Sequence, residues 1–286
     1  MAMGPGLKPA SGARPRGRRF AVAALVLLMF VSFAPARGRP QAPAGPDHEP
    51  WTRLLERFVT ADSRVNYGEW KKTETAELDA YLASLAQPWP AALTDAGRKA
   101  ALINAYNALT LRWVLQHYPE KSIWRTPDPF RAERHTVNGR KVSLDGIENE
   151  LRATGDARIH AALVCAARSC PPLRREAYTA GRVEQQLDEN MRAWLANPAL
   201  NQFAPAEGRA RISSIFNWYG KDFGGGRPAL LKFLARYAPP AARPLLESGK
   251  ARVNFLRYHW GLNDTGDLGS DYSHRQFLWD RVRNVF

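Results

Sequence analysis

The sequence predicts an α+β fold, in which a helix-rich single domain packs on a small, mostly antiparallel sheet. Apolar residues recur at helical spacing in several segments, which indicates amphipathic helices. Asn138-Gly139 lies between two short runs and is the dipeptide that accepts a type I′ hairpin turn. Residues 252–258 alternate between polar and apolar side chains, as a half-buried strand does.

The first 36 residues have the pattern of a secretory signal peptide. Residues 1–19 contain five basic residues and no acidic one, residues 20–33 are apolar apart from Ser32, and Ala34-Pro35-Ala36 supplies the small residues of a cleavage site. The apolar run is shorter than the roughly 20 residues of a membrane-spanning helix, so a retained anchor is the weaker alternative. The sequence therefore predicts an exported protein, periplasmic or extracellular, with no transmembrane segment once the signal peptide is removed.

The mature chain is expected to be basic and to begin with a tether. Residues 37–50 are rich in Pro, Gly and Ala, which predicts a flexible linker before a globular domain at 51–286. The formal net charge is +14, and residues 1–36 hold five positive charges and no negative one. Such a balance favours contact with anionic envelope polymers or lipid headgroups. Nucleic-acid binding is not expected, because the arginines are scattered rather than clustered in runs.

The globular part divides into helices and a few short extended segments, in chain order. Helices are expected at residues 51–59, 75–85, 94–117, 144–153, 179–195, 214–219, 230–237 and 241–246. Extended segments are expected at 65–67, 158–164 and 252–258, with a hairpin at 136–142. Thr94 or Asp95 can cap the third helix and Ser143 the fourth. Residues 224–226 are three glycines without the Lys-Ser/Thr of a phosphate loop, which predicts a flexible turn.

The helix at residues 94–117 is apolar almost all round, which is typical of a helix enclosed on every side. Asn104 and Asn107 lie three residues apart within it and are therefore neighbours on its surface. Their amides need partners, because an unpaired polar group in a core costs about 1–3 kcal/mol. The two asparagines either tie down a neighbouring loop or line a site and orient a catalytic group or a substrate.

Both cysteines lie in residues 156–173, which also contain His160. Residues 159–164 are short, apolar and enclosed by polar residues, so we expect a buried strand there. In a strand, His160 and Cys165 would point to opposite faces. His160 is therefore expected to meet a thiol through Cys170, which the loop stiffened by Pro171 and Pro172 brings back.

The order of these segments resembles the DUF547 family, a domain of unknown function. The residues that carry the resemblance are 103–109, 143–148, 158–160, 165–173, 215–219 and 260–263. The resemblance implies membership over residues 51 to 264, without implying a reaction. One position departs from it: the family commonly has histidine after Ile147-Glu148, whereas this chain has Asn149.

Several interpretations of the cysteine loop remain open. Cys165 and Cys170 can form a disulfide, which is natural in an exported chain with two cysteines. Alternatively, Cys170 is a nucleophile activated by His160, with Asn104, Asn107 or Glu148 fixing the imidazole. This is the logic of papain-like and transglutaminase-like enzymes, by chemistry only. A zinc site with His160 and both thiolates lacks an evident fourth ligand. Inert buried thiols are the remaining alternative.

The sequence thus supports two hypotheses about function. One is a cysteine-dependent hydrolase or acyl transferase that acts on an envelope component. The other is a non-catalytic envelope-binding or scaffold domain, in which Cys165 and Cys170 form only a structural disulfide. No metal and no cofactor are expected in either case.

Overall fold

The longest helix, α4 (Asp95–His117), is the element around which the domain packs. The computed structural model describes residues 45–285, so the predicted signal peptide and most of the predicted tether lie outside the described residues. The Thr94 hydroxyl accepts a hydrogen bond from Gly97 N at 3.1 Å and caps α4. Residues 100–111 of α4 are buried without interruption, so the prediction of an enclosed helix is confirmed.

Three helices precede α4 and share an aromatic core. They are α1 (Glu49–Phe58), α2 (Tyr67–Thr73) and α3 (Thr75–Ala86). Trp51 stacks on Tyr81 with ring centroids 5.8 Å apart, and Phe58 stacks on Trp70 at 4.8 Å. Such rings bury large apolar areas, so they fix these helices against one another. Helix α1 begins at Glu49, within the segment expected to be tether.

The hairpin predicted at Asn138-Gly139 is confirmed. Strands β1 (His135–Val137) and β2 (Arg140–Val142) pair antiparallel, and both turn residues have positive φ, 50° and 69°. Their backbone N–H groups donate to the carbonyls of Leu85 and Ala86, so the turn is anchored to the end of α3. The chain then enters α5 (Leu144–Arg152), which the Ser143 hydroxyl caps at Gly146 N, 3.0 Å away.

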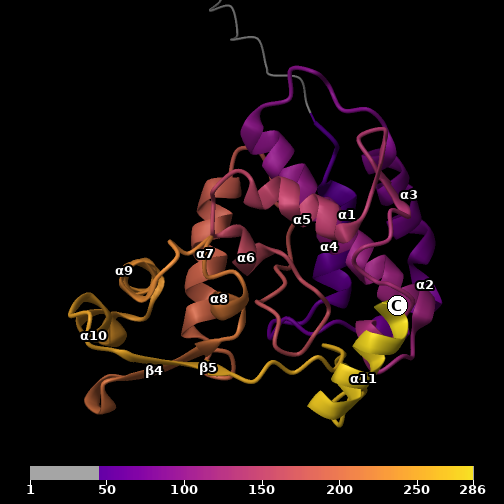
Figure 1. Cartoon of the computed structure of the whole chain (residues 1–286). Helices are drawn as coiled ribbons and strands as arrows, with labels where there is room; N and C mark the ends of the chain where they lie inside the picture. Colours follow the sequence, from indigo (N-terminus) through magenta and orange to yellow (C-terminus); the bar gives the residue numbers. More distant parts are fainter. Residues whose placement is uncertain (1–44, 286) are drawn as a thin grey trace, which may run out of the picture. The chain divides into compact units, whose positions relative to one another are not determined.

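A second small sheet contains β3 (Gln202–Ala204), β4 (Arg209–Ser213) and β5 (Arg252–Leu256), in that order. The β3–β4 pair is antiparallel and the β4–β5 pair is parallel. Between β4 and β5 the chain forms α8 (Ile215–Trp218), α9 (Arg227–Tyr237) and α10 (Arg243–Glu247). The last two lie at the left edge of Figure 1. Two small sheets and many helices make an α+β domain, as predicted.

The strand predicted at residues 158–164 is wrong: the chain forms one helical turn, α6 (Ile159–Ala162). The backbone of this segment finds its partners in side chains instead of in a neighbouring strand. The Asn107 amide donates to Ala162 O and accepts from Val164 N, each at 2.9 Å, and the Asn190 amide donates to Ala161 O. Because these amides satisfy the buried backbone groups, no strand partner is needed. A six-residue apolar run cannot distinguish the two outcomes by periodicity.

Two helices, α2 and the last helix, α11 (His274–Val285), and two strands, β3 and β4, were not predicted. Helix α7 (Val183–Ala196) was predicted, although it begins at Val183 rather than at residues 179–181. In Figure 1, α11 lies at the lower right, beyond the end of β5. No helix within residues 45–285 is long and apolar enough to cross a membrane.

Candidate functional site

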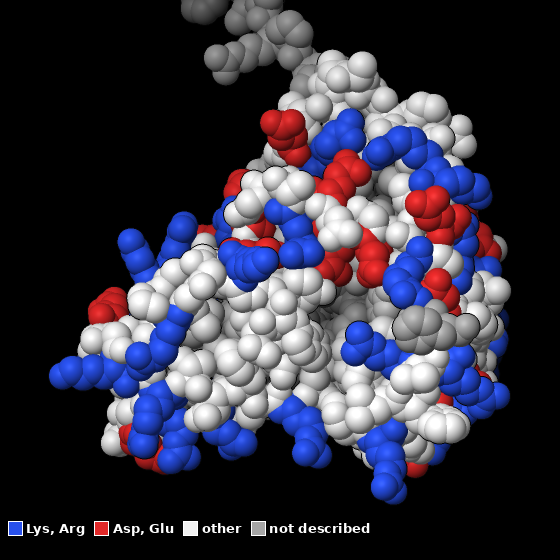
Figure 2. Space-filling view, viewed as in Figure 1, with Lys and Arg blue, Asp and Glu red and all other residues white. Residues whose placement is uncertain are grey.

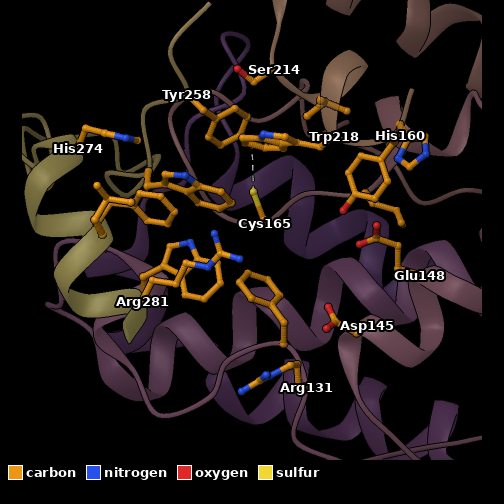
Figure 3. A pocket seen from close by; sticks show the side chains of 18 of the residues that line it. Arg131, Asp145, Glu148, His160, Cys165, Ser214, Trp218, Tyr258, His274 and Arg281 are labelled. Carbon is orange, nitrogen blue, oxygen red and sulfur yellow. Dashed lines mark hydrogen bonds between the residues drawn. The ribbon is translucent and has the colours of Figure 1, made fainter. Parts of the chain in front are cut away.

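A pocket of about 650 Å³ opens between α4, α5, α6, α8 and α11. Its walls combine aromatic rings with acidic, basic and thiol side chains (Figure 3). The aromatic residues are Tyr106, Trp124, Phe130, Trp218, Tyr219, Tyr258, Trp260 and Phe277. The other reactive or charged residues are Asp128, Arg131, Asp145, Glu148, His160, Cys165, Ser214, Arg257, His274 and Arg281. A concave, largely aromatic pocket with a few polar groups is the usual form of a ligand site.

Trp260 is the centre of the aromatic wall. Its ring centroid lies 5.4 Å from that of Trp124 and 4.6 Å from that of Tyr258. It stacks on Trp218 at 5.8 Å and on Phe277 at 5.1 Å, with nearly parallel planes. These rings come from segments between η1 (Ile123–Arg125) and α11. Their contacts therefore hold the C-terminal helix against the rest of the pocket.

The two cysteines are free and lie in contact, but only one of them lines the pocket. Their sulfur atoms are 2.7 Å apart, and Cys165 Sγ also lies 3.2 Å from the Tyr258 hydroxyl. Cys165 lines the pocket, where Figure 3 shows it between Tyr258 and Glu148. Cys170 is buried, and its Sγ accepts hydrogen bonds from Cys165 N at 3.1 Å and Ala167 N at 3.3 Å. The pocket thiol is therefore Cys165, whereas the sequence analysis favoured Cys170.

The environment separates the pKa values of the two thiols. Burial raises the pKa of Cys165 well above its ordinary value, and the neighbouring Cys170 raises it further. Burial also opposes ionisation of Cys170, but hydrogen bonds from Cys165, Tyr258 and Ala167 outweigh it, so the Cys170 pKa is lowered. Of the two thiols, Cys170 is therefore the one that ionises more readily.

His160 is held by a carboxylate that the sequence analysis did not identify. Its Nε2 lies 2.8 Å from Asp222 Oδ2, and Arg152 Nε donates to the same oxygen at 2.7 Å. The hydrogen bond from Arg152 lowers the pKa of Asp222, and His160 lowers it further. Burial lowers the pKa of His160 despite its contact with Asp222. A neutral imidazole that donates from Nε2 to a carboxylate has its Nδ1 lone pair free to accept a proton.

Glu148 lines the pocket beside Tyr219. Burial raises the pKa of this carboxyl, and a hydrogen bond with the Tyr219 hydroxyl opposes the rise only in part. Asp145, one turn earlier on α5, also has a pKa raised by burial. Groups that titrate above their ordinary range and face a pocket are candidates for proton transfer. Glu148 is the more buried of the two and is the stronger candidate.

Asn104 and Asn107 do not line the pocket. Both amide groups bind backbone: Asn104 donates to Tyr178 O at 2.8 Å and accepts from Tyr178 N at 2.9 Å. Asn107 likewise makes two hydrogen bonds with backbone: it donates to the carbonyl of Ala162 and accepts from the N–H of Val164. The two asparagines thus tie down loops, the first of the two roles considered above. Asn107 acts on the segment that leads directly to Cys165.

The residues predicted to form a site are brought together only in part. His160, Glu148 and Cys165 line one pocket, but His160 and Cys165 share no hydrogen bond within residues 45–285. Among those residues, no group of three or more His, Cys, Asp or Glu side chains is arranged to hold a metal ion. Tyr219 and Trp260 were not predicted as site residues, although both lie in segments that carried the family resemblance. Asp222 carried no signal in the sequence.

Comparison with known proteins identifies a family and no characterised relative. Residues 90–195 match the family described as "Protein of unknown function, DUF547". No curated protein and no solved structure matches the chain. The matched segment runs through α4, α5, α6 and α7 and contains Glu148, His160 and both cysteines. The resemblance to the DUF547 family is thus supported over residues 90–195.

Proposed function

We propose that the domain is a cysteine-dependent hydrolase or acyl transferase that acts on an envelope component, with Cys165 as the nucleophile. The observation that supports this is one pocket lined by Cys165, His160 and Glu148 together. A thiol hydrolase needs a sulfur that the substrate can reach, a group that accepts the proton of this thiol, and a group that protonates the leaving group. Cys165 replaces Cys170 in this role because only Cys165 lines the pocket.

The contacts around Cys165 support the following roles in an acyl transfer. Cys170 in its ionised form, with its sulfur 2.7 Å from that of Cys165, accepts the Cys165 proton as the Cys165 sulfur attacks the acyl carbonyl carbon. Glu148 in its neutral form protonates the leaving group as the bond between that group and the acyl carbon breaks. The product is a thioester on Cys165. Water or a second acceptor then attacks the thioester and gives its proton to His160 Nδ1, while Asp222 fixes the ring. The bond between the acyl carbon and the Cys165 sulfur breaks, and this sulfur takes its proton back from Cys170. Exchange with solvent removes the added proton from His160 and returns one to Glu148.

The shape of the pocket supports an acylated substrate of moderate size. Aromatic faces around Trp260 offer flat apolar surfaces, and Arg257 and Arg281 add positive charge to the lining. A negatively charged envelope molecule that carries an apolar or ring-shaped group matches both features. This is consistent with the export predicted from residues 1–36, which itself remains a prediction.

The test follows thiol labelling and acyl transfer in matched variants. Native protein is treated with iodoacetamide, and peptide mass spectrometry records which cysteine reacts; we expect Cys165 to be labelled first. Hydrolysis of p-nitrophenyl acetate, an activated acyl probe, should disappear in Cys165→Ala. It should fall at least tenfold in His160→Gln, while His117→Gln, outside the pocket, serves as the control. Unchanged hydrolysis by Cys165→Ala refutes the proposal.

A specific observation also favours the alternative of a non-catalytic envelope-binding domain. Two sulfurs 2.7 Å apart need only a small movement to reach the bonded distance of about 2.05 Å. In an oxidising compartment such a pair is readily bridged. The intact mass after alkylation, with and without reductant, separates the two proposals. A bridge that resists reduction in the folded protein supports the binding domain and removes the nucleophile.

A further inference from the structure

We propose that the exposed face of α11 is a docking surface for an anionic lipid bilayer. This goes beyond the acyl-transfer proposal and does not depend on it. Five large apolar side chains stand well exposed within the described residues, and three of them lie on α11. They are Leu278, Trp279 and Val282, with exposed fractions of 50%, 71% and 62%.

These three residues form one face of the helix. Positions 278 and 279 lie four and three residues before position 282, so each of them is adjacent to Val282 on the helix surface. The opposite face contains Phe277 and Asp280, which are buried. Tryptophan and aliphatic residues on the outer face of such a helix are suited to the boundary between headgroups and acyl chains.

Basic residues surround this apolar face. Arg257, Arg275, Arg281 and Arg283 are exposed, and none of them forms an ion pair with a carboxylate in the part of the chain that the structure describes. Asp280, the acidic residue within α11, is buried and is bound by the Tyr272 hydroxyl at 2.8 Å. In Figure 2 the charged side chains along the lower edge of the molecule, where β5 and α11 lie in Figure 1, are mainly basic. Each arginine near an anionic membrane surface adds to attraction.

The combination of charge and apolar exposure selects a bilayer over other partners. An anionic polymer would neutralise the arginines but would leave Trp279 and Val282 in water. A second copy of this chain, related by a two-fold axis, would bring the same patch against itself and place arginines opposite arginines. A bilayer with anionic headgroups satisfies the arginines at its surface and buries the apolar side chains just below it.

The pocket and the docking face share residues, so docking would fix the orientation of the pocket relative to the bilayer. Leu278 and Arg281 line the pocket as well as belonging to α11, and Figure 3 shows α11 forming the left wall of this view. Docking through α11 would therefore turn one side of the pocket opening toward the lipid headgroups.

The test is cosedimentation of residues 41–286, the compact unit that contains the whole described core, with sonicated vesicles. One set contains phosphatidylglycerol and phosphatidylcholine in equal parts, and the other contains phosphatidylcholine alone. We expect binding to the first set only, and a decrease in 1 M salt, where the screening length falls to about 3 Å. Two double variants, Trp279→Ser with Val282→Ser and Arg275→Glu with Arg283→Glu, should each lower the partition coefficient at least tenfold.

The matched control is Lys232→Glu with Arg236→Glu, the same charge reversal on exposed positions of α9. It should bind within twofold of the parent if α11 is the docking surface, and a loss as large as that of the α11 variants overturns the proposal. Absence of binding to the anionic vesicles, or equal binding to both vesicle sets, overturns it too. Sedimentation of the free protein as a dimer that the Trp279 and Val282 changes dissociate would assign the face to a second copy instead.

Discussion

The two buried asparagines of α4 provide a matched pair of perturbations that separates fold stability from the geometry of the pocket. Each amide makes two hydrogen bonds with backbone, Asn104 with Tyr178 and Asn107 with residues 162–164. Both side chains are almost completely buried, at 0% and 2% exposure. Replacing either by Ala leaves one buried N–H and one buried C=O without a partner.

The expected loss of stability follows from these two groups. Each unpaired buried group costs about 1–3 kcal/mol, so each variant should lose about 2–6 kcal/mol in the free energy of unfolding. Alanine is the better helix former by roughly 0.5 kcal/mol, which offsets only a small part of this loss. Urea denaturation followed by circular dichroism measures both changes. Similar losses in the two variants are expected, because the number and burial of the bonds are the same.

The two variants should differ at the thiol. Asn107 holds the carbonyl of Ala162 and the N–H of Val164, immediately before Cys165, whereas Asn104 holds Tyr178. The rate of Cys165 alkylation by iodoacetamide should therefore change severalfold in Asn107→Ala and stay near the parent rate in Asn104→Ala. Equal changes of the alkylation rate in the two variants would mean that global unfolding exposes the thiol. This would refute a specific role of Asn107 in positioning Cys165. A loss below 1 kcal/mol in Asn107→Ala would also refute it, by showing that the backbone finds other partners.

Three further predictions concern two residues of the pocket and one close backbone contact. The pKa of Glu148 is raised in the folded protein, so the stability that its neutral form contributes is lost as pH rises through that pKa. Glu148→Gln should therefore melt higher than the parent near pH 7 and equally near pH 4, as calorimetry can check. The pKa of His160 is lowered, so the unfolded chain takes up its proton first as pH falls below 6.5. His160→Gln should therefore weaken the loss of stability between about pH 7 and pH 5, and an unchanged slope in urea titrations would contradict this. Finally, a Cβ at Gly261 would clash with the backbone carbonyl oxygen of Gly269. Gly261→Ala should lower the free energy of unfolding by about 1–3 kcal/mol or more. A variant as stable as the parent would contradict this by showing that the backbone at Gly269 can move away without cost.

The sequence alone determined most of the helices and the hairpin. The enclosed character of α4 was visible because its apolar residues cover every side of the helix. The hairpin was visible because Asn138 and Gly139 tolerate the positive φ of a type I′ turn. The cap by Ser143 was visible because a hydroxyl just before a periodic segment satisfies the first free N–H groups. All these signals act within a few residues of the chain.

The tertiary structure alone decided how the site is assembled. Residues 159–162 turn into a helix because Asn107, 55 positions away, satisfies their backbone. Asp222 reaches His160 across 62 positions, and Tyr258 reaches Cys165 across 93. Helix α11 closes the pocket from the end of the described chain. Local periodicity and turn chemistry carry no information about such distant contacts, because they depend on how whole elements pack around α4. That packing decides which thiol faces the pocket and which carboxylate orients the imidazole.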